Sequence, residues 1–235
     1  MEPVAPPQSQ AELFERVQAL IQSGAHEMPD QSPYLGTGGP GIYLEHQLGL
    51  TTNSADLPDS VGWELKWCSP RTSLVTLFHK EADGPSRIMR YMVRKYGKKD
   101  SQGRLSFRHT VRGRSDRFRV YYESGQLVVR PRGKNGPVPY WLEDSILAAA
   151  GAKLRRLLLV NGERRGREVR FVRADAFDTF SLTDFIYEIE RGEIAIDFDC
   201  RESSPGSAGL RNHGTKFRMA PDSLCRLYMN KRRIR

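Results

Sequence analysis

Two carboxylates and one lysine lie close together in the segment LPDSVGWELKW, which covers residues 57–67. If WELKW forms a β-strand, Glu64 and Lys66 are two residues apart and point to the same face. Asp59 precedes this strand and can reach the same place through a turn. Two carboxylates that converge repel each other unless a cation lies between them, and their oxygen atoms suit Mg²⁺. With a lysine that holds a water or steadies a phosphate, the pattern indicates metal-assisted phosphodiester hydrolysis.

The spacing alone leaves a second interpretation open, in which Glu64 and Lys66 form an ordinary surface ion pair. Three large apolar residues alternate with these charges, namely Trp63, Leu65 and Trp67. Such alternation is typical of a strand with one wet face and one buried face, as a cleft-lining strand requires. The apolar neighbours therefore favour the nuclease interpretation without settling it.

The positive charge is concentrated in two blocks of the chain. The 235 residues carry a net charge of +9, but residues 87–134 hold 15 Lys/Arg against 3 Asp/Glu. Residues 201–235 hold 9 against 2, whereas residues 1–86 hold 4 against 11. Blocks of this kind favour a polyphosphate partner, since each Lys or Arg near a phosphate releases condensed counterions. A solvated basic surface is the alternative.

Composition limits the class of protein. Hydrophobic residues make up 38 % of the chain and charged residues 28 %, which is ordinary for a globular protein. No apolar run reaches the roughly 18 residues of a membrane helix, and MEPVAPPQSQ has no secretory pattern. The cysteines, Cys68, Cys200 and Cys225, are odd in number and widely spaced. We therefore expect a cytoplasmic protein without disulfides or a zinc site.

Helical and strand patterns alternate along the chain. Helices are predicted at 9–23, 41–50, 86–97, 145–156 and 181–191, with one more basic helix at the C-terminus. Strands are predicted at 63–67, 73–80, 104–113, 117–133 with a hairpin at Ser124-Gly125, 157–160, 194–200 and 216–219. This alternation predicts an α/β or α+β fold of mixed sheets with helices on their faces.

Five stretches, in order, make the chain similar to the MvaI/BcnI group of restriction endonucleases, relatives of the mismatch-repair nicking enzyme MutH. They are GIYLEHQLGL (41–50), LPDSVGWELKW, SLVTLFHK (73–80), RKYGKKDSQGRL (94–105) with the HTV that follows, and RNHGTKFRM (211–219). The resemblance covers about residues 35–230. It implies a PD-(D/E)XK restriction-endonuclease-like core, a second DNA-recognition lobe and a cleft between them.

The resemblance assigns catalytic roles to particular residues. Asp59, Glu64 and Lys66 match the catalytic triad, in which the two carboxylates bind Mg²⁺ and the lysine orients the attacking water. Glu45 matches a further acidic residue that supports this site in MutH-like enzymes.

Residues 1–10 are expected to be disordered. Residues 11–90 and parts of 91–170 would form the catalytic lobe, and 171–235 with parts of 91–170 the recognition lobe.

The resemblance also points to residues that contact DNA. His79 matches a histidine that reads the central base pair in the BcnI branch, whereas Lys216 replaces a second histidine of that branch. The tail residues His213, Lys216 and Arg218 lie on the segment that enters the major groove, and Arg201 matches an arginine of the recognition lobe. Arg and Lys donate to guanine O6 and N7. Phosphate contacts are expected from Lys98, Lys99, Arg112 and Arg114.

The resulting hypothesis is a type II restriction endonuclease that cuts double-stranded DNA at a CC-x-GG site with Mg²⁺. A C or G centre is favoured over A or T. The enzyme is expected to be a bacterial, cytoplasmic monomer that nicks the strands in sequence, protected by a cognate DNA methyltransferase. Two alternatives stay open, a MutH-like repair nickase and a DNA-binding protein without catalysis.

Overall fold

The computed structural model describes residues 4–50, 58–113, 115, 117–133 and 135–234, and its chain forms two compact units. The first unit comprises residues 1–75, 151–181 and 224–235. The second comprises residues 76–150 and 182–223. Each unit is therefore assembled from segments that are distant in the sequence.

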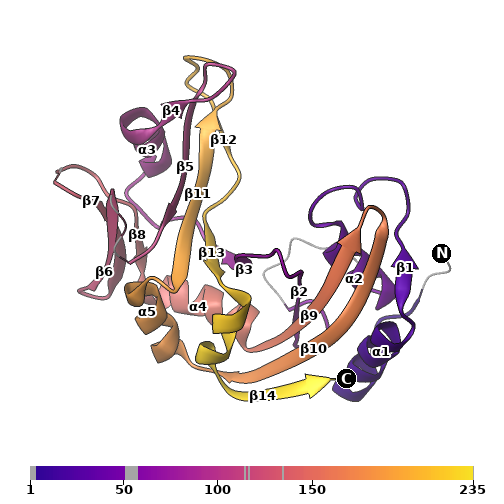
Figure 1. Cartoon of the computed structure of the whole chain (residues 1–235). Helices are drawn as coiled ribbons and strands as arrows, with labels where there is room; N and C mark the ends of the chain where they lie inside the picture. Colours follow the sequence, from indigo (N-terminus) through magenta and orange to yellow (C-terminus); the bar gives the residue numbers. More distant parts are fainter. Residues whose placement is uncertain (1–3, 51–57, 114, 116, 134, 235) are drawn as a thin grey trace. The chain divides into compact units, whose positions relative to one another are not determined.

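A mixed five-stranded sheet forms the centre of the first unit (Figure 1). Its order is β1-β10-β9-β2, and β14 also pairs with β10. β2 runs parallel to β9, whereas the other neighbouring strands are antiparallel. The strands are β1 (Ala25–Glu27), β2 (Glu64–Cys68), β9 (Arg156–Arg165), β10 (Glu168–Phe180) and β14 (Tyr228–Ile234).

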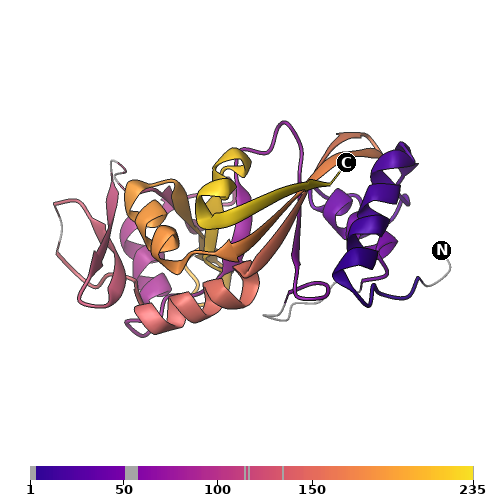
Figure 2. The same cartoon turned by 90° about the horizontal axis from the view of Figure 1, so that it is seen from below.

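Two helices cover one face of this sheet, α1 (Gln10–Gln22) and α2 (Gly39–Gln47). Ser9 caps α1, since its hydroxyl accepts the N–H of Glu12 at 3.2 Å, as the capping spacing predicts. α1 lies along β10 and β14 (Figure 2). The core between helices and sheet includes Leu13, Leu44, Leu65, Leu158 and Ala176. Side chains of β2 that alternate with Leu65 consequently face away from this core.

The second unit contains two further sheets. The larger has the order β3-β13-β11-β5-β4, with β12 beside β11, and the smaller has the order β6-β7-β8. The strands of the larger sheet are β3 (Val75–His79), β4 (Lys98–Lys99), β5 (Leu105–Val111), β11 (Ile194–Glu202), β12 (Leu210–Asn212) and β13 (Lys216–Met219). Those of the smaller sheet are β6 (Phe118–Glu123), β7 (Gln126–Pro131) and β8 (Tyr140–Leu142). The remaining elements are α3 (Ile88–Tyr96), α4 (Glu143–Leu154), α5 (Leu182–Arg191) and the 3₁₀ helix η1 (Pro221–Leu227).

The mixed α/β architecture confirms the predicted fold class, but the C-terminus differs from its prediction. Instead of a basic helix, the chain forms η1 and then β14. Backbone pairing of β14 with β10 outweighs the weak helical preference of its polar residues. β10, with its 13 residues, was not predicted at all. Within the described residues, none of the helices has the length and apolar character to span a membrane.

Candidate active site

β2 places two of the predicted catalytic side chains on one face of the first unit's sheet. Glu64 and Lys66 pair with Leu157 and Leu159 of the parallel strand β9. Leu65, which lies between them, points into the core. The two charged side chains are thus held on the face opposite α1 and α2. The shared face agrees with the alternation in WELKW. The prediction of a wet face is wrong, because Glu64 is buried and Lys66 is half-buried.

A tight turn brings Asp59 back to the same strand. Ser60 and Trp63 exchange two backbone hydrogen bonds, with N···O distances of 3.1 and 2.7 Å. The two residues between them, Val61 and Gly62, have φ angles of 46° and 78°, as in a two-residue hairpin turn. The Asp59 carboxylate then accepts a backbone N–H of β2 at 2.8 Å. The turn therefore fixes Asp59 beside the strand that carries the other two residues.

Glu64 is a buried carboxylate held between two lysines. Its side chain is 4 % exposed, and its Oε1 lies 2.5 Å from Lys66 Nζ. Its Oε2 lies 3.4 Å from Lys153 Nζ. Burial raises the pKa of Glu64 and the charge of Asp59 raises it further, whereas Lys66 and Lys153 oppose the rise. The two lysines therefore favour the ionised form of this carboxylate and offset part of the cost of its burial.

Glu45, on α2, belongs to the same electrostatic cluster. Burial raises the pKa of its carboxyl to about 7, and the negative charges of Asp59 and Glu64 contribute to that rise. Lys66 and Lys153 act in the opposite direction. Three carboxyl groups and two lysines of the first unit therefore interact electrostatically. They are Glu45, Asp59, Glu64, Lys66 and Lys153.

Two members of this cluster were not predicted from the sequence, Lys153 and Tyr228. Lys153 lies in the last turn of α4, and Tyr228 begins β14. The Tyr228 hydroxyl is buried without a hydrogen-bond partner among the described residues. Burial raises the pKa of this phenol, and the charge of Glu64 raises it further. No local pattern around either residue signals this position, because strand pairing alone brings them to Glu64.

The donor set fits a hard divalent cation. Asp59, Glu64 and Glu45 offer only oxygen atoms, and the buried Oε2 of Glu64 makes no hydrogen bond among the described residues. In the described part of the chain, no three His, Cys, Asp or Glu side chains are grouped closely enough for an all-protein metal site. Mg²⁺ typically takes one or two carboxylates and keeps several waters. A site with Asp59 and Glu64 as its protein ligands is consistent with this preference.

A polar face of the large sheet in the second unit carries three of the predicted DNA-contacting residues. Lys216 and Arg218 are two apart on β13, and Arg201 lies on the adjacent strand β11. Lys216 Nζ is 3.9 Å from a carboxylate oxygen of Asp199, and Arg218 Nη1 is 3.1 Å from one of Asp197. These carboxylates orient the cations and offset part of their charge.

The two predicted histidines lie next to this face. His79 ends β3, and its ring is so close to Gly214 that a Cβ there would lie 3.4 Å from its Cδ2. His213 precedes Gly214, and its N–H donates to the Asp199 carbonyl at 2.9 Å. The Glu81 carboxylate accepts the Thr215 N–H at 2.7 Å and so fastens the same loop. Glu81 was not predicted and acts as a support for the two histidines.

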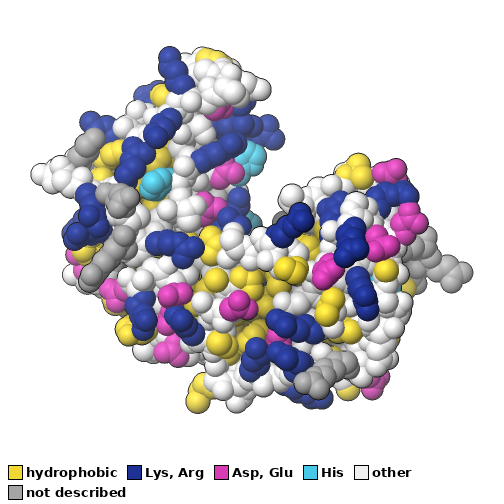
Figure 3. Space-filling view, viewed as in Figure 1, with side chains coloured by type: hydrophobic (Ala, Val, Ile, Leu, Met, Phe, Trp, Pro, Cys, Tyr) yellow, Lys and Arg dark blue, Asp and Glu magenta, His cyan; other side chains and the backbone are white. Residues whose placement is uncertain are grey.

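The structure describes three of the four residues that are expected to contact phosphates. Lys98 and Lys99 are exposed on β4. Arg112 is also exposed, and its Nη1 donates to the Gly192 carbonyl at 3.1 Å. Arg114 lies outside the described residues. Figure 3 shows many Lys and Arg side chains on the surface of the second unit, where these residues belong.

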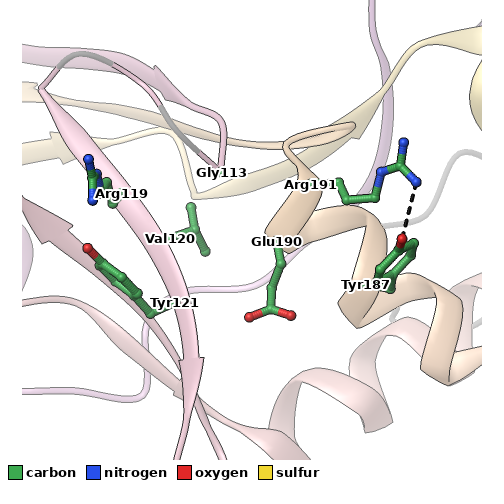
Figure 4. A pocket seen from close by; sticks show the side chains of 7 residues that line it. All are labelled: Gly113, Arg119, Val120, Tyr121, Tyr187, Glu190 and Arg191. Atoms are coloured by element: carbon green, nitrogen blue, oxygen red, sulfur yellow. Dashed lines mark hydrogen bonds between the residues drawn. The ribbon is translucent and has the colours of Figure 1, made fainter.

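A separate cavity of about 790 Å³ lies between α5 and β6 in the second unit (Figure 4). Arg191 donates to the Tyr187 hydroxyl at 3.2 Å at one side of it. None of the predicted site residues lines this cavity. Its lining comprises Gly113, Arg119, Val120, Tyr121, Tyr187, Glu190 and Arg191.

Comparisons with known proteins agree on one family. Residues 19–228 match the MvaI/BcnI restriction endonuclease family. The solved complex of restriction endonuclease MvaI with its cognate DNA substrate has a TM-score of 0.80 and 24 % identity, covering 97 % of this chain and 100 % of that one. MvaI in the absence of DNA has a TM-score of 0.57 and 21 % identity, with coverage of 99 % and 100 %. Among curated proteins, none matches the chain.

Proposed function

Because the chain belongs to the MvaI/BcnI restriction endonuclease family, we propose that it cuts double-stranded DNA at CC-x-GG sites in the presence of Mg²⁺. Family membership makes it a type II site-specific endonuclease. The site sequence, the metal and the order of strand cleavage are our proposals. The observation that carries them is the cluster of Glu64 with Asp59, Glu45, Lys66 and Lys153 in the first unit.

In this proposal the first unit performs the chemistry. Asp59 and Glu64 would hold Mg²⁺, and the bound ion would lower the pKa of a water and offset charge that develops on the phosphate. Lys66, ion-paired to Glu64 at 2.5 Å, would orient the attacking water. Lys153, at 3.4 Å from the other Glu64 oxygen, would favour the ionised carboxylate and hold it in place. Glu45, with its pKa of about 7, can accept or release a proton near neutral pH.

The second unit would read the sequence. Lys216, Arg218 and Arg201 would donate to guanine O6 and N7 of the CC-x-GG frame, as such side chains commonly do. His79 and His213 lie beside them. His79 and Lys216 can both donate to guanine, so we favour a C or G centre, with A or T as the runner-up. Lys98, Lys99, Arg112 and Arg114 would contact phosphates and position the duplex.

One active-site cluster per chain agrees with a monomer that nicks one strand and then rebinds to cut the other. A nearly palindromic target makes the two binding orientations almost equivalent. A bacterial, cytoplasmic enzyme of this kind requires a cognate DNA methyltransferase that protects the host DNA. These features follow from the proposed activity.

Digestion of plasmids that each carry one CC-x-GG site, with A, C, G or T at the centre, tests the proposal. We expect Mg²⁺-dependent cutting of the C and G substrates, passage through a nicked circle and ends that map inside the site. EDTA should stop the reaction. Lys66→Ala should lower the rate by at least about a hundredfold, since it removes a group expected to act at the reacting water, while leaving binding to the site intact.

Two outcomes would contradict the proposal in different ways. Nicked circles that never become linear would indicate a strand-nicking enzyme. Equal, salt-sensitive binding by the natural protein and Lys66→Ala, with no cutting by either under any of the four sequences, would indicate a protein that only binds DNA.

A further inference from the structure

One face of α3 carries a row of positive side chains that the proposed reaction does not use. The opposite face of this helix is buried through Ile88, Met89, Met92, Val93 and Tyr96. Residues three, four and seven positions apart share a helical face. Arg87, Arg90 and Arg94 follow this spacing, and Lys95 adjoins them. We call these four residues, with Tyr91 among them, the α3 stripe: Arg87, Arg90, Tyr91, Arg94 and Lys95.

The cations of the α3 stripe have no acidic partner within the described residues. None of the four makes a side-chain hydrogen bond or an ion pair there. Elsewhere in the same unit arginines are paired, for example Arg108 with Asp199 at 3.0 Å and Arg218 with Asp197 at 3.1 Å. The positive charge on this face of α3 is therefore not neutralised by carboxylates among the described residues of the second unit.

The stripe borders a shallow, open groove. The groove has a volume of about 410 Å³, and Arg87, Arg94 and Lys95 are exposed on it. Figure 3 shows Lys and Arg side chains over the part of the surface where α3 lies. The lining consists of Ser86, Arg87, Arg90, Tyr91, Arg94 and Lys95. A groove bordered by arginines suits a phosphate chain, because guanidinium groups bind phosphate in two-pronged fashion.

The α3 stripe lies on the other side of the large sheet from the polar face. On β11, Phe198 and its strand neighbours of the same parity are buried, whereas Asp197 and Asp199 pair with the cations of the polar face. α3 packs beside β5 and β11 (Figure 1), and its Tyr96 reaches the buried side of β5 through Phe118 and Phe107. One duplex therefore cannot lie on both surfaces of this unit without bending around the sheet.

We propose that the α3 stripe binds the phosphate backbone of a second segment of double-stranded DNA, independently of sequence, while the polar face holds the first. Arg87 and Arg94 are seven residues apart, or about 10 Å along the helix. Over that length duplex DNA carries about six phosphate charges. Four uncompensated cations therefore meet a complementary density of negative charge. The enzyme can then move between DNA segments while it searches for a site. This inference rests on the proposed DNA-cutting function.

A bridging experiment tests the inference. A short CC-x-GG duplex is attached to beads, and the inactive Lys66→Ala protein is bound to it in EDTA. A labelled duplex without any CC-x-GG site is then added. We expect the protein to retain the labelled duplex. Adding Arg87→Gln and Arg94→Gln should lower this retention roughly tenfold. A plot of the logarithm of the binding constant for the labelled duplex against the logarithm of the salt concentration should become less steep by about 1.8, or about 0.9 per cation removed. Binding of the variant to the bead duplex should stay unchanged and shows that the protein is folded.

The matched control removes two charges from the same unit at another place. Arg119 and Arg132 are exposed and belong to the second unit. Arg119→Gln with Arg132→Gln should retain the labelled duplex as the parent does. Equal losses in both double variants would assign the effect to net charge and overturn the inference. So would a parent protein that holds the bead duplex but retains no second one. Absence of cleavage by the natural protein would instead refute the proposed function and leave the bridging result readable.

Discussion

The two oxygens of Glu64 meet two different lysines, and only one of them belongs to the local sequence motif. Lys66 approaches Oε1 at 2.5 Å, and Lys153 approaches Oε2 at 3.4 Å from α4. Without Lys153 the buried carboxylate would lose a cation that opposes the rise of its pKa. The pKa of Glu64 would then rise further.

We therefore expect Lys153→Met to slow single-turnover cleavage about tenfold at pH 7, with most of the loss recovered at higher pH, because losing a neighbouring positive charge raises the pKa of the buried Glu64 carboxyl further. Lys153→Arg keeps the charge and should retain most of the activity. The measurement is the single-turnover rate on a CC-x-GG duplex between pH 6 and pH 9. A loss that is the same at every pH, or that Arg does not rescue, would show that Lys153 acts only through packing.

Glu45 should make the metal-free protein less stable as the pH rises. The pKa of Glu45 is raised from 4.5 to about 7 in the folded protein. The folded state thus binds more protons than the unfolded state between these values, and its stability decreases with pH across this range. The full effect is at most about 3 kcal/mol.

Glu45→Gln removes this titration. In EDTA, its urea midpoint should exceed that of the natural protein at pH 8, while the two should agree more closely at pH 4.5. If the natural protein loses no stability relative to Glu45→Gln between these two pH values, the carboxyl is not part of the buried cluster.

The active-site residues that could be predicted from the sequence are those that lie close together in it. Asp59, Glu64 and Lys66 lie on one turn and one strand, so their spacing alone indicates that they can meet. Glu45 was found through the family motif. Lys153 and Tyr228 come from distant segments, and only the pairing of β2 with β9 and of β10 with β14 brings those segments to the site.

At the scale of elements, β10 and β14 show where local patterns fail. Val169 and Phe171 alternate as a strand requires, but a bulge between Phe171 and Arg173 shifts the alternation to Ala174 and Ala176. Because the bulge moves the buried side chains from odd-numbered to even-numbered positions, the alternation of buried and exposed residues does not predict one continuous strand. β14, YMNKRRI, is almost uniformly exposed and so carries no pattern of burial. Its pairing partner, and not its own composition, makes it a strand.

The basic character of β14 also has a structural use. β10 is the strand partner of β14, and no other strand of the described residues pairs with β14. Exposed Lys and Arg residues on such an edge discourage pairing with other chains. Two of its cations also surround a buried carboxylate of β10. Arg233 Nε is 3.1 Å and Lys231 Nζ 3.8 Å from Asp175 Oδ1. The tail charge that favoured a nucleic-acid contact is therefore partly engaged within the protein.

At the scale of the whole molecule, the number of basic residues in a charge block overstates the positive charge that is free to contact a partner. Residues 87–134, with 15 Lys/Arg against 3 Asp/Glu, lie entirely in the second unit. Among the described residues, three of its cations are nevertheless paired with carboxylates. Arg104 pairs with Asp100 and Arg130 with Glu123 inside the block, whereas Arg108 pairs with Asp199 of β11. Charge counts from the sequence cannot identify the last pair, because its partners meet only through the sheet.

The division into two units, each with its own core, predicts that a local defect in one unit stays within it. Asp175 is 2 % exposed and lies among three half-exposed cations, so Asp175→Asn leaves them without their shared counter-charge. Because these cations remain partly hydrated, we expect a loss of about 1–3 kcal/mol, less than for a fully buried pair. Hydrogen exchange followed by mass spectrometry should accelerate about 5- to 100-fold in β9, β10 and β14, and stay unchanged in β5 and β11.

Asp178→Asn is the matched control on the same strand. The Asp178 Oδ1 accepts hydrogen bonds from Asn230 at 2.7 Å and from the Thr179 hydroxyl at 3.0 Å, and an amide oxygen can also accept both. It should alter exchange by less than about twofold, in keeping with an effect below ~0.5 kcal/mol. Faster exchange in β5 and β11 of Asp175→Asn would show that the two units unfold as one. In that case the chemistry of the first unit and the sequence reading of the second would share a single folding transition.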